Sequence, residues 1–139
     1  MRFLSNKILF VDDDPDDLEF YGESMRQVQP DLIIEECRSG MKALEYLLNA
    51  KTNGGLPCLI VLDVNMPVMS GKETLLAIKK DPDLFNIPVV IFSTTSSPRE
   101  KEYFSEYEVE FFTKPCSFSE MEIIAKKLLS YCLVDIKHK

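Results

Sequence analysis

The feature that most constrains this chain is an apolar run at positions 58–62 that leads directly into a single carboxylate, Asp63. Five apolar residues in succession are typical of a strand that is buried on both faces of a sheet. Met66 and Pro67 follow closely, and proline cannot continue a regular strand. The pattern therefore places Asp63 at the mouth of a sheet, and in open α/β sheets ligands bind at the carboxyl ends of the strands.

A second apolar strand, expected at 7–11, runs in the same way into Asp12, Asp13 and Asp14. If the two strands are parallel neighbours, their acidic ends lie side by side. Several carboxylates within a few ångströms repel one another, so the cluster needs a cation unless one carboxyl stays protonated. Because all of its ligands would be oxygen atoms, the site suits Mg²⁺ better than Zn²⁺.

Strand and helix patterns alternate along the chain. We expect strands at 7–11, 32–34, 58–62, 87–92 and 108–112, and helices at about 15–28, at about 70–80 and after caps at Ser39, Ser97 and Ser117. Such βα units predict an α/β fold, a five-stranded parallel sheet with helices on both faces. A doubly wound strand order of 2-1-3-4-5 would bring the acids of the first and third strands together at the topological switch point.

Two other strand ends also carry polar groups. Ser93 follows the expected strand 87–92, and Lys114 follows the expected strand 108–112. At one edge of a parallel sheet, Lys114 and a metal would neutralise phosphoryl oxygens while the Ser93 hydroxyl donates a hydrogen bond. Asp63 could then act as the nucleophile, so the sequence predicts a site for phosphoryl transfer.

These motifs, taken together and in this order, resemble the receiver domain of two-component response regulators. The matching segments are 8–14, 62–67 with Gly71, Ser93 with Thr94, and 114–115. The resemblance covers about residues 6–132 and implies the flavodoxin-like (βα)5 fold with strand order 2-1-3-4-5. It also implies one receiver domain over residues 1–139 with no effector domain.

The resemblance implies a role for each acidic residue. Asp63 would be the phosphoacceptor, receiving its phosphoryl group from a sensor histidine kinase or a histidine phosphotransfer protein. Asp12, Asp13 and Asp63 would hold Mg²⁺ together with the backbone carbonyl of Asn65. The protein would be a switch rather than an enzyme, catalysing only its own phosphorylation and dephosphorylation.

The resemblance also implies how the switch works. Ser93 would be the switch hydroxyl and Phe111 the switch aromatic, and Lys114 would stabilise the phosphoryl group. The Lys114–Pro115 peptide bond would be cis, which is uncommon for proline in general. The helix after Ser97, the last strand and the last helix would present the changed surface. Residues 107–109 depart from the family, which commonly has a small Gly-Ala pair there.

The composition of the chain limits the classes of partner that it can bind. Sixteen basic residues against 23 acidic ones give a net charge of -7, which argues against nonspecific nucleic-acid binding. No apolar run approaches the ~18 residues of a membrane span. We expect a cytoplasmic protein, in keeping with the cysteine usage. The four cysteines form no C-x-x-C pair and are expected to be reduced and packed: Cys37, Cys58, Cys116 and Cys132. A monomer or homodimer that signals to an unknown downstream protein is the expected state.

Three other functions are compatible with parts of the pattern. A haloacid-dehalogenase-like phosphatase also uses an aspartate nucleophile and Mg²⁺, but it needs an acid two residues later, where this chain has Asn65. A flavodoxin-like FMN carrier needs a phosphate loop after the first strand, where the acids at 12–14 would repel phosphate. A pseudo-receiver would bind partners without phosphorylation, but the intact set of site residues argues against it.

Overall fold

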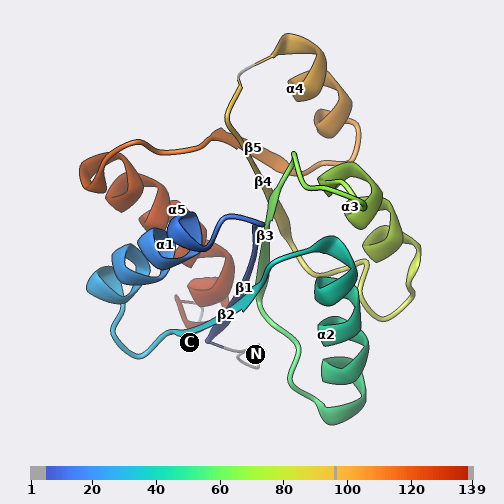
Figure 1. Cartoon of the computed structure of the whole chain (residues 1–139). Coiled ribbons are helices and arrows are strands. Elements are labelled where there is room, and N and C mark those ends of the chain that lie inside the picture. The colour runs from blue at the N-terminus through green and yellow to red at the C-terminus, as the bar shows by residue number, and fades with distance from the viewer. Residues whose placement is uncertain (1–5, 96, 138–139) are drawn as a thin grey trace.

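The computed structural model describes residues 6–95 and 97–137, and the side chains of these residues up to Cys132. Strands and helices alternate as the sequence predicts (Figure 1). The strands are β1 (Lys7–Val11), β2 (Ile33–Cys37), β3 (Leu59–Asp63), β4 (Val89–Ser93) and β5 (Glu110–Thr113). The helices are α1 (Pro15–Val28), α2 (Gly40–Asn53), α3 (Gly71–Lys80), α4 (Pro98–Ser105) and α5 (Phe118–Lys137).

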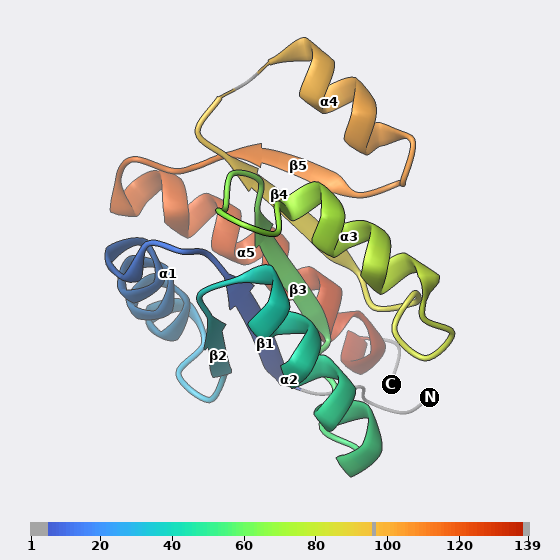
Figure 2. The ribbon, with the colours of Figure 1, turned by 45° about the vertical axis from the view of Figure 1, so that its right-hand side comes forward.

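The strands form one parallel sheet in the order β2-β1-β3-β4-β5, which confirms the predicted topology. Helices α1 and α5 cover one face of the sheet, and α2, α3 and α4 cover the other (Figures 1 and 2). Every residue of β3 and β4 is buried, as expected for central strands. The three layers place the carboxyl ends of β1, β3, β4 and β5 at one edge.

Alternate residues of each strand contribute to two separate apolar clusters. Leu9 and Ile60 pack with α2, α3 and α4, whereas Ile8, Leu59 and Val61 pack with α1 and α5. This alternation follows from the period of two residues in a strand. Because both faces of the central strands β3 and β4 are filled with apolar side chains, their polar residues, Asp63 and Ser93, stand at the strand ends.

Four of the five strands differ from their expected bounds by one to three residues, and for two of them the backbone gives the reason. Strand β4 begins at Val89, directly after Pro88, because proline has no N–H group to donate to the sheet. The fifth strand begins at Glu110 because Glu108 has φ 57, in the left-handed region, which ends an extended segment. None of the helices in the described ranges is long and apolar enough to cross a membrane.

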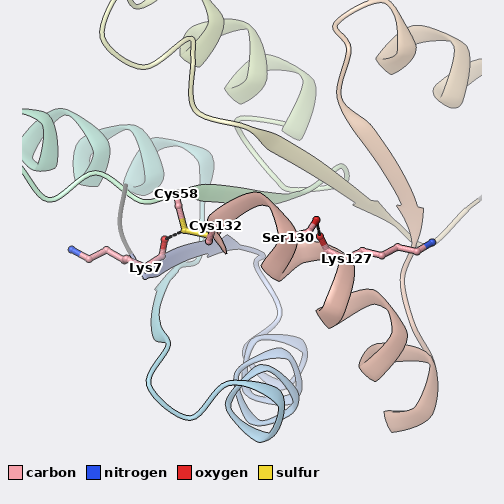
Figure 3. The surroundings of a disulfide bond; sticks show 5 residues. All are labelled: Lys7, Cys58, Lys127, Ser130 and Cys132. Atoms are coloured by element: carbon pink, nitrogen blue, oxygen red, sulfur yellow. Dashed lines mark hydrogen bonds between the residues drawn. A yellow bond between two sulfur atoms is a disulfide. The ribbon is translucent and has the colours of Figure 1, made fainter. Parts of the chain in front are cut away.

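The expectation of reduced, packed cysteines is wrong for three of the four residues. A disulfide joins Cys58, just before β3, to Cys132 in the last turns of α5 (Figure 3). The two residues are 74 positions apart in sequence, but the fold brings their Cα atoms to 5.2 Å. Cys37 is free and buried as expected, whereas Cys116 is free but exposed. Spacing alone could not show the pairing, since it depends on how α5 packs on the sheet.

Candidate functional site

The site begins with two acids at the ends of adjacent strands. Val11 of β1 pairs with Leu62 of β3, so Asp12 and Asp63 are the next residues along each strand. Both are nearly inaccessible, with 1% of Asp12 and 4% of Asp63 exposed, while Asp13 is exposed. Carboxylate oxygens of these three acids lie within 4.8 Å of one another. The strand order therefore assembles the acidic cluster that the sequence predicted.

Lys114 enters the same cluster from the end of β5. Its Nζ lies 2.9 Å from Asp12 Oδ2, 3.3 Å from Asp63 Oδ1 and 3.0 Å from Asp17 Oδ2. Its backbone N–H donates to the Ser93 carbonyl at 2.7 Å, which fixes the loop against β4. Sequence reasoning missed the contact between Asp17 and Lys114, because Asp17 lies in the first turn of α1 and the direction of its side chain depends on how that helix packs.

The Lys114–Pro115 bond is trans, and the expectation of a cis bond is wrong for this structure. Trans is the lower-energy isomer of an X–Pro bond in the absence of a constraint. Here Lys114 reaches both Asp12 and Asp63 with the trans bond in place.

Burial governs the electrostatics of the cluster. Removal from water, together with the charge of Asp12, raises the pKa of Asp63 to about 6, against the opposing effect of Lys114. Burial likewise raises the pKa of Asp12. Burial alone would lower the pKa of Lys114, but hydrogen bonds from its ammonium group to Asp12 and Asp17 outweigh that effect and raise it.

The donor set fits a hard divalent cation. The carboxylates of Asp12, Asp13 and Asp63 carry up to three negative charges, and the ammonium group of Lys114, which also contacts Asp17, offsets only part of them. A divalent cation would balance that charge and favour the ionised forms of the acids. All the candidate ligand atoms are oxygens, which suits Mg²⁺ or Mn²⁺.

The hydroxyl of Tyr21 helps to hold the Asp12 carboxylate in position. This hydroxyl donates to Asp12 Oδ2 at 3.4 Å, while the tyrosine ring packs against Phe10 and Phe92. Burial raises the pKa of Tyr21, so the hydroxyl keeps its proton and remains a donor. The other Asp12 oxygen accepts from the Asp14 N–H at 2.9 Å. Sequence reasoning missed this role of Tyr21, because the apolar spacing of a helix does not indicate the partner of a tyrosine hydroxyl.

The loop after β3 approaches the site closely. Gly71, the first residue of α3, donates its N–H to the Val64 carbonyl at 2.9 Å. A Cβ atom at Gly71 would collide with the backbone carbonyl of Asp63, so glycine is what lets α3 begin against the end of β3. Asn65, the expected carbonyl ligand, is exposed on this loop. Val68 is 92% exposed and has φ 68.

Ser93 is completely buried at the end of β4 and does not bond to the acidic cluster. Its hydroxyl donates to Glu100 Oε1 at 3.1 Å and accepts from the Thr95 N–H at 3.2 Å. The Thr95 hydroxyl donates to the same Glu100 oxygen at 3.1 Å. Sequence reasoning missed Glu100 as a neighbour of Ser93, because a glutamate three residues after the cap Ser97 has the form of a capping box.

The two phenylalanines of β5 lie on opposite faces of the sheet. Phe111 is half-buried and its ring centroid lies 6.0 Å from that of Phe104 in α4. Phe112 packs on the other face, 6.1 Å from Phe92. The predicted switch aromatic therefore sits beneath α4, the helix that follows Ser93.

Comparison with known proteins identifies the family. The model of the response regulator receiver domain matches residues 8–126. The chain belongs to this family. Receiver domains act in two-component signalling, where they accept phosphoryl groups from sensor histidine kinases. The match sets aside the phosphatase and FMN-carrier alternatives.

The chain is 30% identical over 134 residues to response regulator Rcp1 of Synechocystis sp., covering 93% of this chain and 90% of that protein. It is 35% identical over 111 residues to a probable cyclic di-GMP phosphodiesterase of Vibrio cholerae, covering 79% of this chain but only 23% of that protein.

Solved receiver structures have the same fold. The phosphorylated cyanobacterial phytochrome response regulator RcpA superposes with a TM-score of 0.80 at 32% identity, covering 91% of this chain and 93% of that one. The Mn(2+)-bound form of Rcp1 gives a TM-score of 0.74 at 28% identity, covering 89% and 91%.

Proposed function

We propose that this protein is a phosphoacceptor response regulator in which Asp63 receives the phosphoryl group in a Mg²⁺-dependent reaction. The observation that carries the proposal is the buried Asp63 carboxylate, with Lys114 Nζ at 3.3 Å and the carboxylates of Asp12 and Asp13 beside it. A buried nucleophile with a fixed ammonium group and a cation site is the arrangement that phosphoryl transfer requires.

In the proposed reaction, an Asp63 oxygen forms a bond to phosphorus as the bond from phosphorus to the donor breaks. The electron pair of the broken bond leaves with the donor, which we propose is a phosphohistidine of a sensor histidine kinase or a phosphotransfer protein. Lys114 is held by Asp12 and Asp17 within reach of the new phosphoryl oxygens. These residues contribute mainly by positioning and charge neutralisation.

Asp12, Asp13, Asp63 and the backbone carbonyl of Asn65 would hold the cation. When bound, Mg²⁺ supplies positive charge against the phosphoryl oxygens. The existence of a Mn(2+)-bound form of Rcp1, a protein of the same fold, supports the binding of a divalent ion. Tyr21 and the Asp14 amide hold the Asp12 carboxylate in position.

The proposed output is a change in the surface formed by α4, β5 and α5. Phosphorylation adds about -1.5 to -2 charge units at Asp63, and Ser93 then donates to a phosphoryl oxygen. Ser93 precedes the segment that leads into α4, and Phe111 lies beneath that helix. A movement of Ser93 is thereby coupled to the position of Phe111, in a two-state equilibrium that phosphorylation biases.

The test is intact-mass spectrometry after incubation with acetyl phosphate and Mg²⁺, alongside Asp63→Asn and a sample treated with EDTA. We expect one added phosphoryl group in the wild-type protein and none in either control. An adduct of equal size in Asp63→Asn would assign the chemistry to another residue. A folded wild-type protein that takes no phosphoryl group from acetyl phosphate or from a phosphohistidine protein would be a pseudo-receiver.

A further inference from the structure

The Ser93 hydroxyl is already committed to a partner in this structure. A serine hydroxyl carries one proton, and that of Ser93 is donated to Glu100 Oε1 at 3.1 Å. Glu100 Oε1 also accepts from the Thr95 hydroxyl at 3.1 Å, so one carboxylate oxygen ties together both hydroxyls after β4. A bond from Ser93 to a phosphoryl group therefore requires that the bond to Glu100 be broken.

A comparison of three helix starts shows that this contact is particular to Glu100. Helices α3, α4 and α5 each begin directly after a serine that is followed three residues later by glutamate, the pattern of a capping box. Glu73 completes the box by accepting from the Ser70 N–H at 2.9 Å, and Glu120 accepts from the Cys116 N–H at 2.7 Å. Glu100 instead turns its carboxylate to two hydroxyls, one of which belongs to a buried residue of the site.

We propose that Glu100 is a positioning residue that holds the Ser93 hydroxyl away from Asp63 and thereby lowers the level of phosphorylation. The inference rests on the proposed function and adds to it a residue of α4 that competes for the switch hydroxyl. Hydrogen bonds to a charged acceptor are about twice as strong as neutral ones, so the competition is substantial. The half-exposed Glu100 carboxylate can move into water once Ser93 leaves it.

The variant that tests the proposal is Glu100→Gln, which keeps the shape and an acceptor oxygen but removes the charge. Glu102→Gln is the matched control, because Glu102 is an exposed residue of the same helix and its substitution removes the same charge. Rates of phosphoryl gain from acetyl phosphate with Mg²⁺, and of loss after its removal, are measured by intact mass. We expect Glu100→Gln to raise the ratio of gain to loss about fivefold, the difference between a charged and a neutral hydrogen bond, with Glu102→Gln at the wild-type value.

A double-mutant cycle with Ser93→Ala separates positioning from a general effect on α4. If Glu100 acts through Ser93, Glu100→Gln has no effect on the ratio in the Ser93→Ala background. An effect of equal size in both backgrounds, or equal ratios for wild-type, Glu100→Gln and Glu102→Gln, would overturn the inference while leaving the proposed function intact. A wild-type protein that is never phosphorylated would overturn both.

Discussion

The two ends of β3 differ in how they are held. At the amino end, Cys58 is buried and cross-linked to Cys132, and the residues that follow it are packed by apolar side chains on both faces. At the carboxyl end, Asp63 is equally buried, but its neighbours are other charges and the loop beyond it contains Val68 in a left-handed conformation. One strand thus joins a region that stabilises the fold to a region where like charges and backbone strain lower its stability. Such costs are characteristic of functional sites.

The largest effect should come from breaking the cross-link at the amino end. Cys132→Ala should lower the free energy of unfolding by about 2–4 kcal/mol, because the disulfide closes a long loop in the unfolded chain. The freed Cys58 sulfur lies 3.2 Å from the Lys7 carbonyl oxygen, so its thiol retains an acceptor (Figure 3). Urea unfolding provides the measurement.

Cys116→Ala is the control for that experiment, because Cys116 is exposed and free. Its stability should match that of the wild-type protein, and a reductant should destabilise the wild-type protein but not Cys132→Ala. Four alkylatable thiols in the non-reduced, denatured wild-type protein would show that the two ends of β3 are not distinguished by a disulfide.

The opposite change is expected at the carboxyl end. The pKa of Asp63 rises from 3.8 to about 6 on folding, so the folded chain holds this proton more tightly and loses stability as the pH rises between these values. In EDTA at pH 8, Asp63→Asn should therefore raise the free energy of unfolding by about 1–3 kcal/mol. The gain should disappear below about pH 4, where the carboxyl is protonated in both states.

Unfolding curves at pH 4 and pH 8 make this measurement, with Asp31→Asn as the control for loss of an exposed acid. If Asp63→Asn is instead less stable than the wild-type protein at pH 8, the attraction of Lys114 for the Asp63 carboxylate exceeds the combined cost of its burial and its repulsion by Asp12. The contacts at the carboxyl end of β3 would then stabilise the fold, as those at the amino end do.

The smallest effect concerns the strained loop. Val68→Gly should raise the free energy of unfolding by about 0.5–1 kcal/mol, because glycine adopts φ 68 without the clash of a β-branched side chain but loses more entropy on folding. Val68→Ala should give a smaller gain, since it keeps a Cβ. Equal stability of all three proteins in urea unfolding would show that this loop stores no strain.

The same contrast explains what could be predicted from the sequence. The fold and the meeting of Asp12 with Asp63 follow from apolar runs that end in acids, because a parallel sheet puts such ends at one edge. The Cys58–Cys132 pairing depends on where α5 ends against the sheet, and no local pattern shows that. The direction of the Glu100 side chain was also hidden, since serine and glutamate at this spacing predict a capping box whichever donors the carboxylate finally accepts from. The isomer of the Lys114–Pro115 bond likewise depends on tertiary structure and not on the local sequence.

The central claim is that the phosphoryl group goes to Asp63 and to no other acid of the cluster. Borohydride reduces an acyl phosphate to an alcohol, so treatment of the protein after incubation with acetyl phosphate and Mg²⁺ converts the modified aspartate to homoserine. Peptide mass spectrometry then identifies the position. We predict homoserine at position 63 and unmodified aspartate at Asp12 and Asp13. Homoserine at either of those positions, with Asp63 unchanged, would contradict the account.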